Sequence, residues 1–279
     1  MVWRRFMPKQ PSDRIAYFMM LIMIHIVGIY ELFVILPYID YERNKTFWLH
    51  ASAGLFLYFN VMASFYKLFM TDSTSSGVML PTLLMPGWQY CHTCGINTPP
   101  RSFHCWMCDV CILKRDHHCM FSGNCVGHRN QRYFLTMLFY LTVGAAYCNY
   151  LNFDYTFEVL GGLSWKSLLT MILPLLSWTV GLAGTVTFAV SFVSALCIVG
   201  SLLLTFLSLY HGQNLFLGQT CMERTQGNRT YDMGWKENMK GVFGQRWYVA
   251  WISPLIVSPL EGDGLEFRSR YRYENIKDM

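Results

Sequence analysis

Charged residues are scarce in this sequence. Only 14% of its 279 residues are Asp, Glu, Lys or Arg, whereas soluble domains carry roughly 25%. This scarcity argues against an ordinary soluble domain. The sequence also has no long low-complexity tract, and only residues 73–77 (STSSG) have the composition of a flexible connection. With 53% hydrophobic residues, the composition favours a membrane protein.

Long apolar runs indicate where the chain crosses the membrane. A span needs about 20 apolar residues to cross roughly 30 Å of hydrocarbon, and four runs meet this requirement: residues 15–36, 47–70, 133–153 and 186–210. The first run follows a basic start, but it is too long for a cleavable signal peptide, whose apolar region has about 7–15 residues. We therefore predict an all-α polytopic membrane protein with four transmembrane helices, the first of them a retained anchor.

A fifth apolar segment, residues 167–184, leaves the number of spans open. It contains Pro174 and two glycines and lies close to the next run. The basic residues favour four spans. Segments 1–14, 71–132 and 211–279 hold 18 of the 22 Lys and Arg residues, and all three can face the cytosol only if an even number of crossings follows the second segment. The alternative, five spans, would move the C-terminal segment to the other side.

The predicted organisation follows from this count. The cysteine-rich region is cytosolic and lies between the second and third helices, and residues near 167–184 form a lumenal or re-entrant segment. The parts are a cytosolic N-terminus (1–14), helices one and two with a short lumenal loop (15–70), the cytosolic cysteine-rich domain (71–132), helices three and four (133–210) and a cytosolic C-terminal region (211–279). The net charge of +5 fits contact with anionic lipids or an anionic cofactor.

Seven of the ten cysteines lie between residues 91 and 125. Thiols stay reduced in a cytosolic loop, so dense Cys and His indicate metal binding rather than disulfides. The template C-x2-C-x9-H-x6-C occurs twice with a shift of fourteen residues, and each copy supplies the ligands of a closed tetrahedral zinc site. The two Cys3His sets are Cys91, Cys94, His104 and Cys111, and Cys105, Cys108, His118 and Cys125. Because protein fills both coordination spheres, we expect structural zinc ions and disfavour a metal-dependent hydrolase.

Cys119 remains outside both sets. A further shift of fourteen from Cys105 reaches it, but the next ligand position is Ser122, so a third copy of the template does not exist. Asp116 and His117 lie beside it. A neighbouring His can take a thiol proton, and an acid can hold that His in the useful tautomer. We therefore interpret Cys119 as a reactive nucleophile; the alternative is that Cys119 is a metal ligand and His117 a structural hydrogen-bond donor.

The stretch Asp116-His117-His118-Cys119 resembles the signature of the DHHC protein S-acyltransferases, or palmitoyltransferases. The resemblance covers the cysteine-rich region and the four-span layout. It implies that Cys119 takes a fatty acyl chain from acyl-CoA as a thioester and passes it to a protein cysteine with ping-pong kinetics. It also implies His117 as general base, Asp116 as its orienting partner, and two zinc ions held by the sets above. The family further suggests a Golgi or endoplasmic reticulum membrane and acceptors with juxtamembrane cysteines.

Two departures from the family pattern lie near these residues. Where the family usually has T-T-x-E after the last span, this chain has Thr220-Cys221-Met222-Glu223, so we expect a weaker hydrogen bond from the second position back to the catalytic region. Where many members have Pro-Trp after the signature, this chain has Met120-Phe121. Asn238 fits the family's C-terminal packing motif, and we expect it to form structural hydrogen bonds.

Basic residues of the cysteine-rich region are candidate contacts of the CoA phosphates. They are Arg101, Lys114, Arg115, Arg129 and Arg132. Basic residues beside a membrane also bind anionic headgroups, so this alternative stays open. Nucleic acid is not expected as a partner, because the zinc region is tethered to a bilayer. The leading alternative to an acyltransferase is a zinc-binding membrane scaffold, or an inactive relative, that recruits cytosolic partners.

Overall fold

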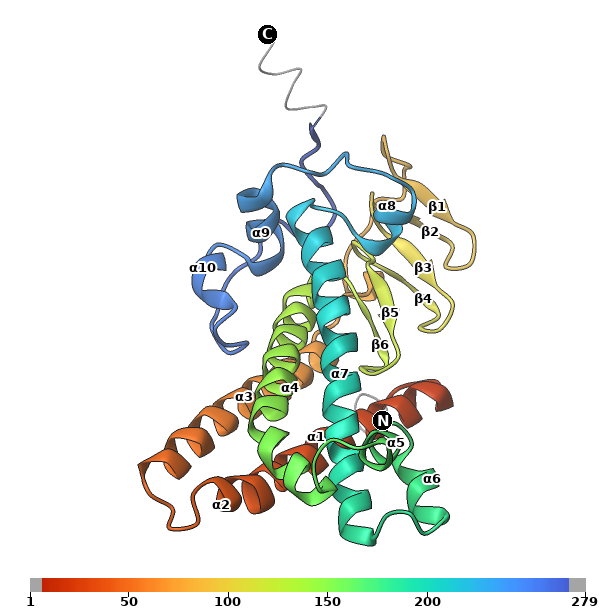
Figure 1. Cartoon of the computed structure of the whole chain (residues 1–279). Coiled ribbons are helices and arrows are strands. Elements are labelled where there is room, and N and C mark those ends of the chain that lie inside the picture. The colour runs from red at the N-terminus through yellow and green to blue at the C-terminus, as the bar shows by residue number, and fades with distance from the viewer. Residues whose placement is uncertain (1–6, 271–279) are drawn as a thin grey trace. The chain divides into compact units, whose positions relative to one another are not determined.

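The computed structural model describes residues 7–270. The first six residues of the predicted N-terminal segment and the last nine of the predicted C-terminal region therefore lie outside the described residues. The chain divides into two compact units, and Figure 1 follows it by colour from red to blue. Unit 1 comprises residues 1–20, 60–137 and 209–279, and unit 2 comprises residues 21–59 and 138–208.

Four helices are long and apolar enough to cross a membrane, as the sequence predicts. The shortest has 26 residues, which corresponds to about 39 Å at 1.5 Å per residue. The first begins at a proline, which suits the first turn of a helix because its missing N–H has no intrahelical partner there. The four are α1 (Pro11–Tyr30) continued by the π-helix η2 (Glu31–Ile35) and α2 (Leu36–Ile39), then α3 (Lys45–Met70), α4 (Gln131–Leu160) and α7 (Thr185–Phe216).

The apolar segment at residues 167–184 forms two short helices in unit 2, α5 (Trp165–Ile172) and α6 (Pro174–Thr179). Ser164 caps α5 by accepting a hydrogen bond from the Ser167 amide at 3.1 Å. Pro174 then separates the two helices, because proline cannot donate the amide hydrogen that a continuous helix requires. Neither helix has the length of a span, and the re-entrant or lumenal placement of this segment stays a prediction.

Unit 1 contains six three-residue strands that the all-α prediction omitted. They pair as three antiparallel hairpins: β1 (Gln89–Cys91) with β2 (Ile96–Thr98), β3 (Phe103–Cys105) with β4 (Val110–Ile112), and β5 (His117–Cys119) with β6 (Asn124–Val126). Each hairpin turns through one left-handed residue, at Gly95 (φ 68°), Asp109 (φ 54°) and Gly123 (φ 62°). These positions are fourteen residues apart, so the repeat in the sequence is a repeat of hairpins. Strands of three residues carry too little alternation of polar and apolar residues to be predicted from a sequence.

The C-terminal helices of unit 1 pack against the end of α7. Its short helices are η3 (Ser75–Gly77), α8 (Cys221–Thr225), α9 (Trp235–Phe243) and α10 (Trp247–Ala250). Leu215 of α7 forms a buried cluster with Val242, Phe243 and Ala250. Asn238 donates a hydrogen bond to the Phe216 carbonyl at 2.8 Å and accepts one from the Met233 amide at 3.1 Å. Asn238 is therefore a structural hydrogen-bonding residue, as predicted.

Candidate active site and metal centres

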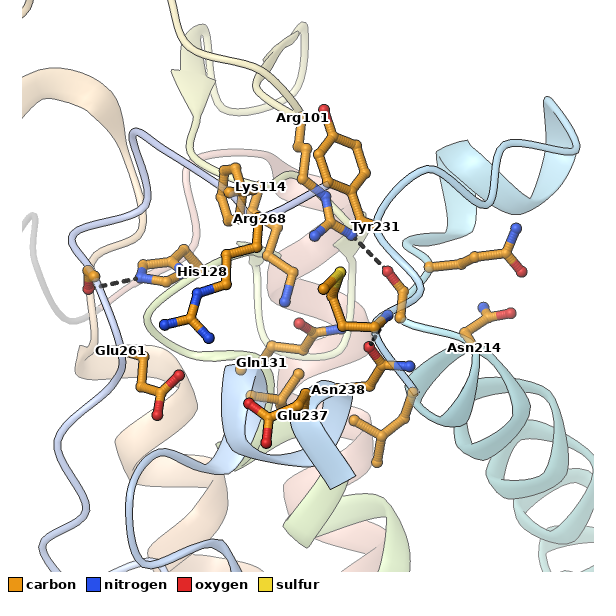
Figure 2. Close-up of a pocket in the computed structure, with 18 of the residues that line it drawn as sticks. Arg101, Lys114, His128, Gln131, Asn214, Tyr231, Glu237, Asn238, Glu261 and Arg268 are labelled. Atoms are coloured by element: carbon orange, nitrogen blue, oxygen red, sulfur yellow. Dashed lines mark hydrogen bonds between the residues drawn. The ribbon is translucent and has the colours of Figure 1, made fainter. Parts of the chain in front are cut away.

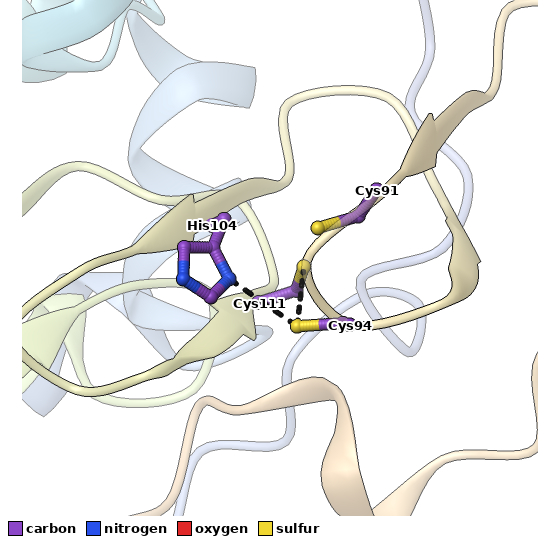
Figure 3. Close-up of side chains that lie close together, drawn as sticks. All are labelled: Cys91, Cys94, His104 and Cys111. Carbon is purple, nitrogen blue, oxygen red and sulfur yellow. Dashed lines mark hydrogen bonds between the residues drawn. The ribbon is translucent and has the colours of Figure 1, made fainter.

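The first predicted ligand set comes together between two hairpins. Cys91 and Cys94 lie at the turn of hairpin β1–β2, whereas His104 and Cys111 form a cross-strand pair in hairpin β3–β4. Figure 3 shows the four side chains converging, and their ligand atoms lie within 4.8 Å of one another. The Cys94 Sγ is 3.2 Å from His104 Nδ1 and 3.6 Å from Cys111 Sγ. Ligands about 2.0–2.3 Å from a tetrahedral zinc are about 3.3–3.8 Å apart, so this set fits such an ion.

The second predicted set repeats this arrangement one hairpin further on. Cys105 and Cys108 lie at the turn of hairpin β3–β4, and His118 pairs across the strands with Cys125 in hairpin β5–β6. The His118 Nδ1 lies 3.7, 3.3 and 3.6 Å from the three sulfurs. Each Cys3His cluster therefore joins one hairpin turn to the next hairpin, and both can hold a metal ion.

The two clusters differ in the carboxylate behind their histidine. His118 Nε2 is 3.0 Å from Oδ2 of Asp13, a carboxylate buried at the start of α1. The carboxylate near His104 Nε2 is that of Asp109, whose Oδ1 is 3.9 Å away and whose side chain is 82% exposed. A carboxylate bound to the far ring nitrogen orients a metal-binding His and increases its basicity. Asp13 was missed by the sequence reasoning, because nothing in the sequence relates it to a residue 105 positions away.

The third hairpin carries Cys119 at the position that Cys91 and Cys105 occupy in the first two. The registers show the equivalence: Cys91 pairs with Ile96, Cys105 with Val110, and Cys119 with Asn124. Ser122 replaces the second thiol of the turn and donates a hydrogen bond from Oγ to the Cys119 carbonyl at 3.3 Å. The backbone thus has three copies of the repeat although the ligand template has two, and Cys119 belongs to neither metal cluster.

A carboxylate–imidazole pair lies next to Cys119. His117 Nδ1 is 2.7 Å from Oδ2 of Asp116, whose side chain is 2% exposed. The other carboxylate oxygen, Oδ1, accepts a hydrogen bond from the Cys221 backbone amide at 2.9 Å, and the Cys221 thiol lies 3.3 Å from Oδ2. The predicted pair of Asp116 and His117 is therefore present, and it is held by the helix that follows the last span.

The charges of these groups are coupled. Burial would lower the pKa of His117, but hydrogen bonds to Asp116 and Cys119 outweigh it and raise that pKa well above its usual value. Burial would raise the pKa of the Cys119 thiol, which is 7% exposed, but the His117 side chain outweighs it and lowers that pKa. Burial also opposes ionisation of Asp116, yet the His117 hydrogen bond keeps the pKa of Asp116 below its usual value. The three groups favour a thiolate and an imidazolium.

Two further aromatic rings pack around His117. Phe134 of α4 lies edge-on with ring centroids 4.8 Å apart, and His211 of α7 lies 5.1 Å away. His211 Nδ1 is also 3.7 Å from the Asp116 carboxylate. The sequence reasoning missed His211, and the only signal was an ionisable ring at the end of the fourth apolar run.

The Thr220–Glu223 segment fixes Cys221 in place. Thr220 and Glu223 form a capping box at the start of α8, in which each side chain accepts a hydrogen bond from the backbone amide of the other. Glu223 also accepts two 2.7 Å hydrogen bonds from Arg101, and both side chains are buried. The donor to Asp116 is the backbone amide of Cys221. This hydrogen bond does not depend on the side chain, so it is kept although cysteine replaces the family's threonine. The expected weakening applies only to the side-chain contact.

Two of the five predicted CoA contacts line a cavity, and the other three do not. Arg101 and Lys114 line one cavity of about 260 Å³, together with His128, Tyr231 and Arg268 (Figure 2). Arg115, Arg129 and Arg132 are not among the residues that line it. The charge of Arg101 is balanced by Glu223. Lys114 is buried, and burial, reinforced by the nearby Arg101 charge, lowers its pKa to about 7.

Comparisons with known proteins show the family of the chain. The profile of the family described as DHHC palmitoyltransferase matches residues 85–228. The chain is 37% identical to the probable palmitoyltransferase ZDHHC24 of Danio rerio over 81% of this chain and 80% of that protein. It is 36% identical to the probable palmitoyltransferase ZDHHC24 of Homo sapiens, covering 79% of this chain and 78% of that protein. The matched region contains both metal clusters, Cys119 and α8.

Proposed function

The chain belongs to the DHHC palmitoyltransferase family and is a protein S-acyltransferase, and we propose that Cys119 carries the acyl group between its two substrates. The observation that carries the proposal is the position of this thiol. Cys119 occupies a metal-ligand position of the hairpin repeat without belonging to either Cys3His cluster, and it lies beside the Asp116–His117 pair.

The first half-reaction forms a thioester on the enzyme. The Cys119 thiolate attacks the carbonyl carbon of acyl-CoA, a new C–S bond forms, and the bond to the CoA sulfur breaks. The CoA sulfur leaves as a thiolate and takes the proton that His117 holds. Because the substrate and the acyl-enzyme are both thioesters, the exchange needs no ATP. Asp116 supports this step by holding the ring of His117 through a 2.7 Å hydrogen bond.

The second half-reaction regenerates the enzyme. The thiol of an acceptor cysteine gives its proton to His117 and attacks the thioester carbonyl, and Cys119 leaves as the thiolate. The two half-reactions share one site, so we propose ping-pong kinetics with an acyl-enzyme intermediate. Met120 and Phe121, at 46% and 44% exposure, follow Cys119 in the turn and are available to contact the acyl chain.

Zinc in the two Cys3His clusters has a structural role in this proposal. Each cluster offers four protein ligands, which leaves no position for a reacting water or substrate. The second cluster includes His118 and Cys125, which flank Cys119 in hairpin β5–β6. Zinc there would hold the nucleophile's hairpin against hairpin β3–β4.

For acyl-CoA, we retain the five predicted basic contacts and consider Lys114 the foremost of them. Lys114 lines the cavity, and within residues 7–270 it forms no salt bridge like the one between Arg101 and Glu223. We expect Lys114→Gln to raise the KM for palmitoyl-CoA about tenfold with a smaller change in kcat, since removal of one charge-assisted contact costs roughly 1.5–3 kcal/mol. Lys236→Gln, at an exposed lysine outside the five and outside the cavity, is the matched control, and an equal change in both variants would contradict the assignment.

The membrane arrangement is also proposed from the distribution of charge and from the family. The cysteine-rich region and both termini face the cytosol, and the acceptors are membrane-associated proteins with juxtamembrane cysteines. A Golgi or endoplasmic reticulum membrane is the proposed location. Protease protection of tagged termini in sealed microsomes tests the orientation, because a protected C-terminus would require a fifth crossing.

The experiment that tests the nucleophile is intact-protein mass spectrometry of purified enzyme incubated with palmitoyl-CoA. We expect one hydroxylamine-labile acyl chain on the wild type and none on Cys119→Ser, with the zinc content unchanged by the substitution. Acylation of both proteins would contradict the proposed role of Cys119. An unacylated wild type with full zinc content would favour a scaffold, and loss of zinc in Cys119→Ser would identify this residue as a ligand.

A further inference from the structure

Four potential metal ligands meet outside the two Cys3His clusters. They are Asp116, His117, His211 and Cys221, and one ligand atom of each lies within 4.8 Å of the others. Asp116 and His211 are buried, at 2% and 8% exposure. The four residues come from the hairpin region, the end of α7 and the start of α8, so the chain brings them together only on folding.

The spacing of the donor atoms resembles that in a tetrahedral site. Oδ2 of Asp116 is 3.7 Å from His211 Nδ1 and 3.3 Å from Cys221 Sγ, and these last two atoms are 3.9 Å apart. Ligands of a tetrahedral zinc are about 3.3–3.8 Å from one another. The Asp116–His117 contact, a hydrogen bond of 2.7 Å, would have to lengthen. Oδ1 of Asp116 accepts the Cys221 amide, which leaves Oδ2 for the other three donors.

The donor types suit zinc and related borderline metals. Two imidazoles, one carboxylate and one thiolate form a mixed N, O and S set of the kind that zinc accepts. The thiolate comes from Cys221, which stands where the family pattern T-T-x-E noted above has threonine. A threonine hydroxyl is a far weaker ligand than a thiolate.

We propose that Asp116, His117, His211 and Cys221 form a third, regulatory zinc site whose occupancy inhibits acyl transfer; this inhibition rests on the proposed role of His117. Binding releases the thiol proton of Cys221 and the extra proton of the His117 imidazolium to solvent, because both ligands bind a metal only in their deprotonated forms. The metal then occupies the lone pair of a His117 nitrogen and the Asp116 carboxylate. His117 can no longer take up the acceptor's proton, and the Cys119 thiolate loses its cationic neighbour.

The site does not need the metal in order to fold. The Cys221 amide is bound to Asp116 at 2.9 Å, and the capping box with Arg101 holds α8 independently. The two Cys3His clusters, in contrast, join hairpins whose strands have only three residues. We therefore expect zinc to leave the third site reversibly under chelator concentrations that leave the clusters loaded.

The binding test uses full-length protein in detergent on a Cys119→Ser background, so that no acyl transfer is required. Metal content is measured after equilibration in buffered zinc, and a cobalt titration reports thiolate ligation by its charge-transfer absorption. We expect one equivalent of metal beyond that of the clusters, lost in Cys221→Thr and in His211→Gln. Cys148→Thr, which removes a cysteine of unit 2, is the control and should keep that equivalent. The same metal content in Cys221→Thr as in its parent would overturn the site.

The functional test measures self-acylation of the protein with its native Cys119 in the same zinc buffers. We expect inhibition that a mild chelator reverses, and Cys221→Thr should raise the zinc concentration for half-inhibition by at least about tenfold, the scale on which metal-site substitutions act. Equal inhibition of both proteins would overturn the proposal. The cluster zinc content shows whether each variant folds. Failure of the nucleophile assignment would appear separately as acylation of Cys119→Ser, whatever the binding test gives.

Discussion

Hairpins β3–β4 and β5–β6 share a backbone and differ in chemistry. Both place a cysteine at the last residue of the first strand, Cys105 in one and Cys119 in the other, and both turn through a left-handed residue. Three residues later the first hairpin has Cys108 and the second has Ser122. Cys105 and Cys108 of the first hairpin lie beside His118 and Cys125 of the next one, whereas Cys119 of the second hairpin lies beside His117.

The difference shows how a metal-binding repeat can yield a nucleophile. A cysteine at a ligand position becomes free when its partner thiol is replaced and the next ligand pair is missing. The hairpin still fixes the position of the sulfur, and the neighbouring cluster can stabilise that hairpin. The proposed reactivity of Cys119 would thus be the consequence of an incomplete third site rather than of a separate catalytic fold.

Removing a ligand from the second Cys3His cluster should have the largest effect on self-acylation. Cys108→Ser removes a ligand of the second cluster, and structural zinc contributes on the order of 10 kcal/mol in small zinc-binding peptides. We expect loss of one zinc per protein, disordering of hairpin β5–β6 and loss of self-acylation. Metal analysis and limited proteolysis provide the measurement. Cys148→Ser is the control, and an active Cys108→Ser protein lacking that zinc would show that the nucleophile's hairpin needs no metal.

Restoring the missing thiol should make the two hairpins more alike. In Ser122→Cys the third turn regains a C-x2-C pair, and the new thiol can form a disulfide with Cys119 in the presence of an oxidant such as diamide. We expect self-acylation to fall at least about tenfold after oxidation and to recover when a reductant cleaves the bond, because only the thiolate attacks. Ser122→Ala, treated identically, should not respond to the oxidant. The prediction fails if both variants respond alike.

A smaller effect should distinguish the two metal clusters. Asp13→Asn removes the charge behind His118, and loss of such a partner typically lowers metal affinity 10–100-fold. Asp109→Asn acts on an exposed carboxylate 3.9 Å from His104 and should change affinity by less than about twofold. Chelator-driven zinc release, followed with a colorimetric indicator, gives both values. Faster zinc release from Asp109→Asn than from Asp13→Asn would contradict this prediction.

The sequence predicted the parts of the site that are local. Fixed spacings identified both Cys3His sets, the odd Cys119 and its neighbours, and apolar runs predicted four span-length helices. The sequence did not predict contacts between distant segments. Asp13 behind His118, His211 beside Asp116, and the Arg101–Glu223 pair join residues more than 90 positions apart. Such contacts depend on how helices and hairpins pack, which no periodicity records. The six strands were not predicted for a different reason: each has only three residues, which is too short to show a periodic pattern.

The bond between Asp116 and the Cys221 amide has an evolutionary and practical consequence. The hydrogen bond joins residues 105 positions apart, with the third and fourth long helices between them. A gene fragment that encodes only the cysteine-rich segment could supply two metal-binding modules, but Asp116 would lose the Cys221 amide that binds its Oδ1. The cysteine-rich segment therefore would not carry transferase activity by itself. Recombination or truncation between residues 132 and 221 should yield metal-binding proteins without transferase activity, so the segment after the last span would be inherited with the signature.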